Sequence, residues 1–418
     1  MRMAVDGSGG LAGRARVEDA LAWIDAHAPP LGREEVPVAD AAGRVLCEDV
    51  LAEADLPPFD RAAVDGIAVR ADETVGASTY NPLLLRLAAG GAGDLAAGTA
   101  VRVCAGDPLP RGADAVVPLD HVEAGEEGAC AVIEPAVGGN EVERAGSLGA
   151  RGSILLAAMR QLRPGDIGAL AAAGRARVAV VGRPRVRCVL SGAVAEAGTP
   201  PAPGAVHDGN GPMLRSLIER DGGVGAELRR VERKREALRA ALEPPGVDIV
   251  LVAGGTGRGG NDHAAAALAE AGELAIDGVA LRPGATAGIG RTKAGVPVLL
   301  LPGTPAACLC AYELIAGRAI RRLGGRNPAL PLVSRTMTAA RKIVSEIGVT
   351  EVVPVRCANR AEVEPMPSFA AAGLRAVTEA DGFVVVPEGS EGYQRGAMVT
   401  VYLYDDRAAS SEPAHARS

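Results

Sequence analysis

The chain has 418 residues, of which 48% are hydrophobic and 23% charged, the balance of a soluble globular protein with about two to four domains. Its formal net charge of −7 argues against a general nucleic-acid binder, because phosphate contacts need a basic patch. The seven cysteines include no CxxC pair and the five histidines are scattered, so neither a zinc site nor a disulfide framework is indicated. No signal-peptide pattern and no apolar run of ~18 residues is present, so we expect a cytoplasmic protein without a membrane span.

The N-terminal third mixes one helix with short strands. Residues 1–13 are Gly-rich and expected to be loose, and apolar residues at helical spacing predict a helix over 17–28. Short β-type runs with frequent Gly and Pro between 84 and 158 predict a small β-rich domain. Before them, Asp65-Gly66 interrupts apolar residues as a turn with a functional carboxylate does, although an ordinary Asp-Gly turn has the same pattern.

Strand and helix patterns alternate between residues 183 and 323, which predicts a mostly parallel sheet with helices on both faces. The expected strands are 186–190, 249–252 and 297–301, and the expected helices 211–220, 233–242, 262–271 and 305–323. The charged stretch 229–239 fits the solvated face of a helix. Beyond residue 326 the composition predicts another small β domain, followed by a disordered tail at 407–418.

The most informative stretch is Asp248 to His263, DIVLVAGGTGRGGNDH. A β-branched apolar run is followed by a glycine loop and then by an Ala-rich helical pattern. That order lets backbone N–H groups and a helix dipole approach an anionic group. The loop is neither a dinucleotide fingerprint nor a Walker loop, and an ordinary glycine-rich turn remains the alternative. Because ligands bind parallel sheets beyond the carboxyl ends of the strands, the loops that start at Ser191, Gly254 and Pro302 are the predicted binding edge.

Several motifs of the chain occur, in order, in a known family. They include LPPFDRAAVDGIAVR, CAGDPLPRGADAVVPLDHVE, RPRVRCVLSG, HDGNGPML, AGGTGRGGNDH, LRPGATAGIG and LPGTPAAC. These resemble LPxFDNSAMDGYAVR, TGAPLPEGADAVVxxExxE, RPRVAVLSTGDEL, YDSNRYML, SGGVSVGDADY, MKPGKPLAFG and LPGNPVSA of the molybdopterin molybdenumtransferases, which include bacterial MoeA and the E domain of gephyrin. The resemblance covers roughly residues 15–405.

The resemblance implies an activity and an architecture. Adenylylated molybdopterin and molybdate would give molybdenum cofactor and AMP, with Mg²⁺ as the usual divalent cation. The implied fold is multidomain α/β plus β, with a central three-layer α/β molybdopterin-binding domain, an inserted β-rich domain and a small C-terminal β-barrel-like domain. The expected boundaries are 14–32 with 151–182 for a linking domain, 33–150 for the inserted domain, 183–326 for the α/β domain and 327–406 for the C-terminal domain. An elongated homodimer is implied, with the site between the α/β domain of one subunit and the second domain of the other.

Site residues follow from the matching positions. The expected catalytic carboxylates are Asp65, Asp208 and Asp262, and Asp65 and Asp262 are also the expected metal ligands. The expected pterin- and phosphate-binding residues are Gly254, Gly255, Thr256, Gly257, Asn210, Arg282, Pro302, Gly303, Pro305 and Arg144.

Other polar positions of the family pattern are replaced. The threonine of TGAP is Ala105, the acidic pair of AGED is Ser147-Leu148, that of STGDEL is Ala193-Val194, and the two lysines of KPGKP are Arg282 and Ala285. An Ala-Val pair cannot hold a hard cation, which needs oxygen ligands; Glu196, just beyond it, is a candidate substitute. GGTG with Asp262 has the spacing of the GGTGxxxRD loop of molybdopterin adenylyltransferases, or it is drift in a Gly-rich chain.

Two functions therefore remain open. The chain is a molybdenumtransferase, or it is a non-catalytic protein that binds or carries molybdopterin or the finished cofactor. A scaffold role has no support in the residues. A molybdopterin adenylyltransferase and acceptor molybdoenzymes are the implied partners, beside the pterin substrate.

Overall fold

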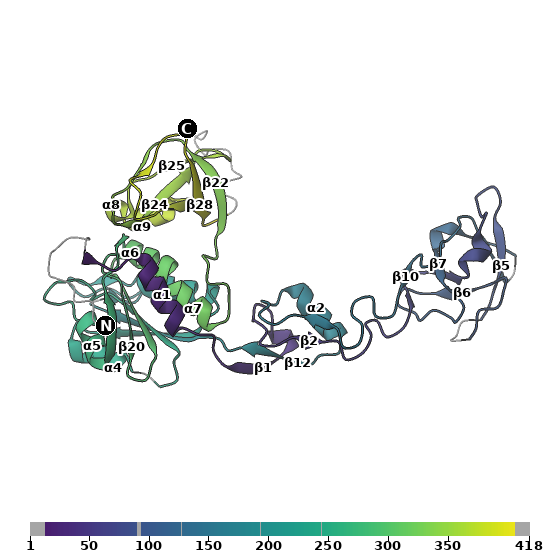
Figure 1. Ribbon diagram of the computed structural model, residues 1–418, viewed down its shortest axis with the longest axis horizontal. Coiled ribbons are helices and arrows are strands. Elements are labelled where there is room, and N and C mark those ends of the chain that lie inside the picture. Colours follow the sequence, from purple (N-terminus) through teal and green to yellow (C-terminus); the bar gives the residue numbers. More distant parts are fainter. Residues whose placement is uncertain (1–12, 90–92, 127, 193, 244, 406–418) are drawn as a thin grey trace. The chain divides into compact units, whose positions relative to one another are not determined.

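The computed structural model describes residues 13–89, 93–126, 128–192, 194–243 and 245–405. The predicted loose segment 1–13, apart from Gly13, and the predicted tail 407–418 lie outside the described residues. The chain divides into two compact units, residues 1–34 with 181–418 and residues 35–180 (Figure 1). Each unit is described by itself. Within the described residues, no helix is long and apolar enough to cross a membrane.

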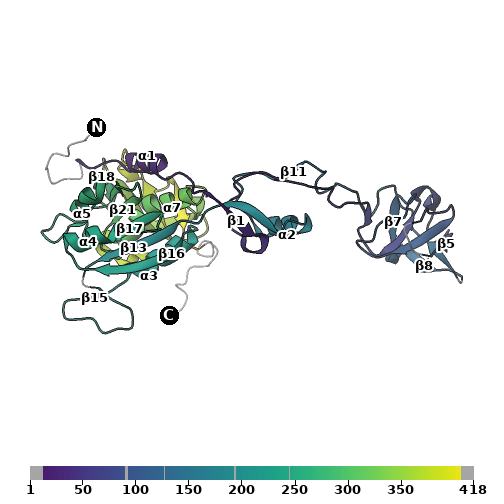
Figure 2. The same ribbon diagram turned by 90° about the horizontal axis from the view of Figure 1, so that it is seen from below.

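A six-stranded sheet forms the centre of the first unit. Its strand order is β16-β13-β17-β21-β20-β18, and the strands lie side by side in Figure 2. They are β16 (Val224–Val231), β13 (Arg185–Ser191), β17 (Ile249–Ala253), β21 (Pro297–Leu301), β20 (Gly288–Thr292) and β18 (Gly272–Asp277). The first four are parallel, and β20 and β18 are added antiparallel at one edge. The predicted, mostly parallel sheet is thus confirmed.

Strands β17 and β21 are apolar throughout because they lie between two hydrophobic cores. In β17, Leu251 contributes to the core on one face and Val250 to the core on the other, and both are fully buried. In β21, Leu299 and Val298 divide in the same way. Side chains alternate between the faces of a strand, so a strand covered on both sides needs a continuous apolar run. Each such side chain stabilises the fold by about 1.5–3 kcal/mol.

Helices cover both faces of this sheet. The helices α1 (Val17–His27), α3 (Asn210–Arg220), α6 (Pro305–Ala311) and α7 (Gly317–Leu323) supply residues to one core, and α4 (Arg235–Ala241) and α5 (Ala264–Ala271) to the other. Figure 1 shows α1 beside α7, with which it is in contact. The predicted helices are present, with ends shifted by one or two residues. The assignment of 229–239 to one helix face was wrong, because residues 229–231 continue edge strand β16, where charged side chains are common.

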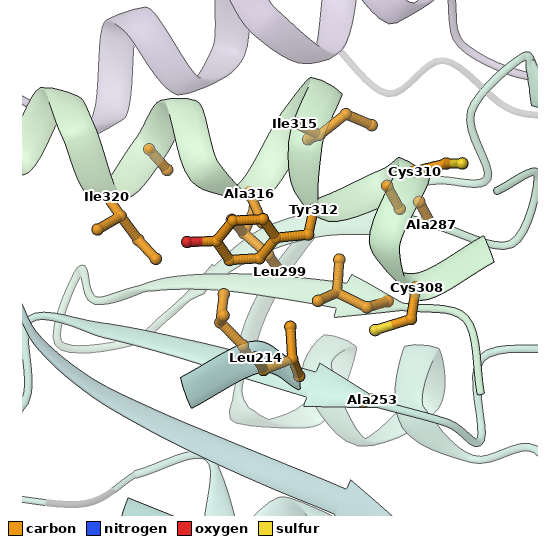
Figure 3. Packing of buried hydrophobic residues seen from close by; sticks show 14 of the residues in the cluster. Leu214, Ala253, Ala287, Leu299, Cys308, Cys310, Tyr312, Ile315, Ala316 and Ile320 are labelled. Atoms are coloured by element: carbon orange, nitrogen blue, oxygen red, sulfur yellow. The ribbon is translucent and has the colours of Figure 1, made fainter. Parts of the chain in front are cut away.

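The predicted helix over 305–323 contains a single π-helical turn, Tyr312–Ala316, between α6 and α7. Figure 3 shows the Tyr312 ring between this helical run and the strands, next to Leu214 of α3. The Tyr312 hydroxyl donates to Asp221 Oδ2 at 3.1 Å, and Arg321 donates to the same oxygen at 2.8 Å. Burial is the main reason why the pKa of Tyr312 lies well above its ordinary value. A paired buried carboxylate therefore anchors the helical run against α3.

The C-terminal part of this unit is a closed five-stranded barrel, as expected. Its strands pair in the order β24-β25-β22-β28-β26, and β26 returns to β24. They are β22 (Val333–Ala339), β24 (Thr350–Cys357), β25 (Glu362–Pro365), β26 (Gly382–Val386) and β28 (Met398–Leu403). A separate pair is formed by β23 (Ile343–Val344) and β27 (Gly392–Tyr393). The short strand β19 (Leu281–Arg282) of the α/β part joins β24, and α8 (Phe369–Ala372) and α9 (Leu374–Glu379) contact α6.

The second unit contains the predicted β-rich domain. Its six-stranded sheet has the order β7-β4-β6-β5-β9-β8 and its own hydrophobic core. These strands are β4 (Gly66–Val69), β5 (Leu83–Leu87), β6 (Thr99–Val103), β7 (Ala115–Pro118), β8 (Val122–Ala124) and β9 (Ala129–Val132). Three short strand pairs and helix α2 (Pro164–Ala172) complete it. The pairs are β2 (Val50–Leu51) with β11 (Ile154–Leu156), β3 (Arg61–Ala62) with β10 (Val142–Glu143), and β1 (Arg33–Pro37) with β12 (Arg177–Val181).

Candidate functional site

A pocket of about 550 Å³ lies at the carboxyl ends of β13, β17 and β21. Strand β13 leads into α3 on one face of the sheet and β17 leads into α5 on the other. Because the two strands lead to helices on opposite faces of the sheet, a crevice is left between their carboxyl ends, and open α/β sheets bind ligands in such a crevice. The predicted site residues in its lining are Asp208, Asn210, Gly254, Gly255, Thr256, Gly257, Asp262, Pro302 and Gly303.

The glycine loop is shaped by the close approach of two strand ends. Gly254 and Gly255 have φ values of 89° and 70°, a region that side-chain-bearing residues rarely adopt. A Cβ on Gly254 would lie 2.7 Å from the carbonyl oxygen of Ser191, and one on Gly303 would lie 3.2 Å from Cα of Gly254. Within the described part of the chain, the amide N–H groups of 255–257 donate no hydrogen bond. The loop therefore presents unpaired backbone donors beside the N-terminus of α5, an arrangement that suits an anion.

Asp262 closes this loop. Its Oδ2 accepts a hydrogen bond from the N–H of Gly259 at 3.0 Å, and the residue is half-buried. Gly257 passes so near that a Cβ there would lie 2.4 Å from the same oxygen. Among the described residues, Asp262 Oδ1 has no hydrogen-bond partner, so one carboxylate oxygen faces no competing donor.

Asp208 is a neutralised carboxylate. It is 6% exposed, and Oδ1 accepts from the N–H of Gly211 at 2.8 Å while Oδ2 accepts from Arg230 at 3.1 Å. Both oxygens are engaged where α3 begins. Asp208 is thus better suited to fixing the start of α3 than to receiving a cation.

Two buried polar atoms in the pocket lining lack partners among the residues that the structure describes. Ser191 is 6% exposed and Asn210 9% exposed, and within those residues neither Ser191 Oγ nor Asn210 Oδ1 has a hydrogen-bond partner. The amide nitrogen of Asn210 donates to the carbonyl of Gly303 at 2.8 Å, which leaves the amide oxygen as an acceptor. Unsatisfied buried polar atoms cost about 1–3 kcal/mol each, so their presence here points to a ligand that pairs with them. Thr256, by contrast, already bonds the hydroxyl of Thr286 at 3.0 Å.

Two predicted residues of this unit are near the pocket but outside its lining. Arg282 pairs with Glu346 and, at 3.8 Å, with Glu351, both from the C-terminal barrel. Pro305 begins α6, and its ring lies 3.6 Å from where a Cβ on Gly209 would be. Glu196, the candidate substitute for the missing acidic pair, is exposed and outside the lining, whereas Val194 lines the pocket. Ala193 lies outside the described residues.

Asp65 and Arg144 belong to the other unit. Asp65 is exposed just before β4, and its Oδ1 accepts from the N–H of Ala105 at 2.7 Å. Arg144 pairs with Asp60 at 2.6 Å. The pKa of Asp60 is lowered first by the N–H of Ala145 and then by Arg144. Both predicted residues are therefore held by local contacts within residues 35–180.

Sequence reasoning missed several residues of the pocket. Arg233, Gly284 and Thr286 line it, and Ser191 was expected only as the start of a loop. Gly284 and Thr286 could have been predicted, because both lie in the LRPGATAGIG segment that resembles a family motif. Arg233 had none, because its charged surroundings resembled a solvated helix face. In the described ranges, no group of three or more His, Cys, Asp or Glu residues could hold a metal ion.

Three family profiles match the chain in sequence order. "MoeA N-terminal region (domain I and II)" matches residues 15–174, "Probable molybdopterin binding domain" matches 178–322 and "MoeA C-terminal region (domain IV)" matches 336–404. The pocket described above falls within the second.

Curated relatives and solved structures agree with these matches. Molybdopterin molybdenumtransferase 2 of Mycobacterium tuberculosis is 32% identical over 325 residues, covering 73% of this chain and 79% of its own. Molybdopterin molybdenumtransferase 1 of the same organism is 31% identical over 422 residues, covering 92% and 98%. The crystal structure of molybdopterin biosynthesis MoeA protein from Pyrococcus horikoshii gives a TM-score of 0.76 at 27% identity, over 94% of this chain and 100% of that one.

Proposed function

We propose that this chain, which belongs to the molybdopterin molybdenumtransferase family, inserts molybdate into adenylylated molybdopterin with release of AMP. Members of the family are transferases of molybdenum cofactor biosynthesis. The observation that carries the proposal is the pocket at the carboxyl ends of β13, β17 and β21, in which buried Ser191 Oγ and Asn210 Oδ1 have no partner in the described part of the chain.

The pocket has complementary groups for the two chemical parts of such a substrate. Asn210 Oδ1 is an acceptor that suits the N–H and NH₂ donors of a pterin ring. The amides of 255–257, at the N-terminal end of α5, suit its phosphate. A phosphoanhydride can be cleaved by positioning and charge stabilisation, so no covalent nucleophile is required of the protein. Asp262, with one free oxygen, is the carboxylate best placed to orient the reacting group.

The alternative is a non-catalytic protein that binds or carries molybdopterin or molybdenum cofactor. It is favoured by one observation, the apolar Val194 in the lining where the family pattern has an acidic residue. Binding of the pterin is common to both functions. They differ only in turnover.

Complementation of a molybdenumtransferase-deficient cell separates the two functions, with a molybdopterin-binding assay on the purified chain beside it. We expect rescue by the full chain and loss of rescue by Asp262→Ala and by Asp65→Ala. Binding without rescue would establish the carrier function instead. A chain that neither binds nor rescues would refute both.

Further features belong to the same proposal. We propose a cytoplasmic homodimer in which Asp65 and Arg144 of one subunit complete the site of the other, with the four-domain boundaries expected from the resemblance. Transfer of substrate from a molybdopterin adenylyltransferase and of product to acceptor molybdoenzymes would follow. Mg²⁺ at Asp65 and Asp262 stays a prediction of the resemblance. Crosslinking of Cys-substituted subunits and equilibrium sedimentation test the dimer.

A further inference from the structure

Arg233 occupies an unusual position among the charged residues of the first unit. It follows β16, and it lines both the pocket and an adjoining hollow of about 420 Å³. Val231, the last residue of β16, is paired with Ser191 and accepts a hydrogen bond from the N–H of Gly192 at 3.1 Å. A Cβ on Gly192 would lie 3.1 Å from Arg233 Nε. The guanidinium therefore lies over the backbone that follows β13, and Ser191 Oγ, which has no hydrogen-bond partner among the described residues, lines the same pocket.

Charged side chains next to Arg233 in sequence and on β16 form ion pairs. Arg230 pairs with Asp208 at 3.1 Å, Lys234 with Glu232 at 2.5 Å, and Arg235 with Glu270 at 3.1 Å. Across the ranges that the structure describes, Arg233 forms no ion pair or hydrogen bond, and its side chain is exposed. An unpaired surface arginine is common, but this one contacts a ligand-sized pocket. The planar guanidinium of an arginine can donate two parallel hydrogen bonds to a phosphate.

The carboxylates of the pocket do not fit a divalent cation. Mg²⁺ and Ca²⁺ prefer about six oxygen ligands, and carboxylates are the usual protein donors. Both oxygens of Asp208 are already engaged, and Asp262 retains only one free oxygen. Val194 adds no oxygen at all from its side chain. Arg233 and the loop amides therefore supply positive character to an anionic ligand in this lining.

We propose that Arg233 is a specificity-determining residue that binds the anionic group of a phosphorylated pterin directly, so that binding requires no divalent cation. This inference rests on the proposed function, because it assigns the ligand class of the same pocket. Arg233 supplies the positive charge that a cation would otherwise bring to the phosphate. Ser191 Oγ and the amides of 255–257 complete the set of donors.

The test uses two probes and the full chain. Intrinsic pterin fluorescence reports binding of 6-hydroxymethylpterin monophosphate and of unphosphorylated 6-hydroxymethylpterin, each with EDTA or with excess Mg²⁺. We expect the phosphorylated probe to bind at least about tenfold more tightly, as a charge-assisted hydrogen bond predicts. Its affinity should change less than about twofold between EDTA and Mg²⁺. Arg233→Gln should remove most of the phosphate preference, and Arg233→Lys should retain part of it.

Arg235→Gln is the matched control, since Arg235 lies two residues away, is exposed and pairs with Glu270 outside the pocket lining. It should leave both affinities unchanged. Equal binding of the two probes, an unchanged preference in Arg233→Gln, or loss of binding in EDTA would overturn the inference while leaving a pterin pocket intact. Failure of both probes to bind would overturn the proposed function itself. Thermal denaturation of each variant confirms that the fold is retained.

Discussion

Replacing Gly257 by alanine would move the Asp262 carboxylate without removing it. A Cβ at this position would lie 2.4 Å from Asp262 Oδ2. Ordinary contact begins near 3.4 Å, so the carboxylate must shift by about 1 Å. The shift strains the hydrogen bond from the N–H of Gly259, which contributes about 0.5–1.5 kcal/mol. Reduced freedom of the unfolded chain offsets about 0.4–1 kcal/mol of that loss, so the free energy of unfolding should change by less than about 1 kcal/mol.

Gly257→Ala should lower the rate of turnover far more than it lowers the free energy of unfolding. A displacement of about 1 Å in a positioning group can slow a reaction by up to about a hundredfold, so we expect Gly257→Ala to form molybdenum cofactor ten to a hundred times more slowly. Gly260→Ala is the control, because no atom lies within 4 Å of a Cβ there and its φ is not in the left-handed region. Single-turnover conversion of adenylylated molybdopterin with molybdate measures the rate. Equal rates in the two variants, at equal thermal stability, would refute a positioning role for Asp262.

Three further predictions concern the framework and its titrating groups. Asp221→Ala leaves a buried arginine without its carboxylate, so the free energy of unfolding measured in urea should fall by about 3–5 kcal/mol; a loss below about 1 kcal/mol would contradict this. The side chain of Arg160 lowers the pKa of Asp166 from 3.8 to about 2. The stability that Asp166 contributes should thus be complete above about pH 4 and disappear as the pH falls toward 2, and Asp166→Asn should remove this dependence from urea midpoints. Cys104 is exposed, whereas burial raises the pKa of the Cys188 thiol to about 12. A thiol reagent at pH 8 should therefore label Cys104 in the folded chain and Cys188 only after unfolding, as peptide mass spectrometry would show.

The α/β part was predictable because its patterns are local. A run such as Ile249 to Val252 has no polar residue, which only a strand buried on both faces tolerates, and the structure places its side chains alternately in two cores. The helix over 305–323 was predicted from its length and apolar content. Its π-helical turn at Tyr312–Ala316 was not, because that turn accompanies the contact between the Tyr312 hydroxyl and Asp221, which is 91 residues distant in sequence.

The edge strand β16 was harder to predict. Strand β16 carries Glu227, Arg229 and Arg230, and such a composition fits an exposed helix as well as a strand with one paired edge. Only its register against β13, in which Arg187 lies opposite Glu227 and the two side chains pair at 2.5 Å, decides between them. That register is a long-range property of the fold, because the two strands are separated in sequence by α3, which contacts both of them.

The site shows the same division between local and long-range information. The order of strand, glycines and helix predicts the Gly254–Gly257 loop as a phosphate-binding element, and the structure places this loop in the pocket lining. Arg282 was expected there because it replaces a family lysine, yet Glu346 and Glu351 of the barrel hold it. Arg233 arrives at the pocket instead, through the pairing of Ser191 with Val231. In the proposed assignment, Arg233 supplies from the end of β16 a positive charge that the family pattern has at position 285, where this chain has Ala285. The proposed preference for a phosphorylated ligand then holds although the residues that create it differ from the family pattern.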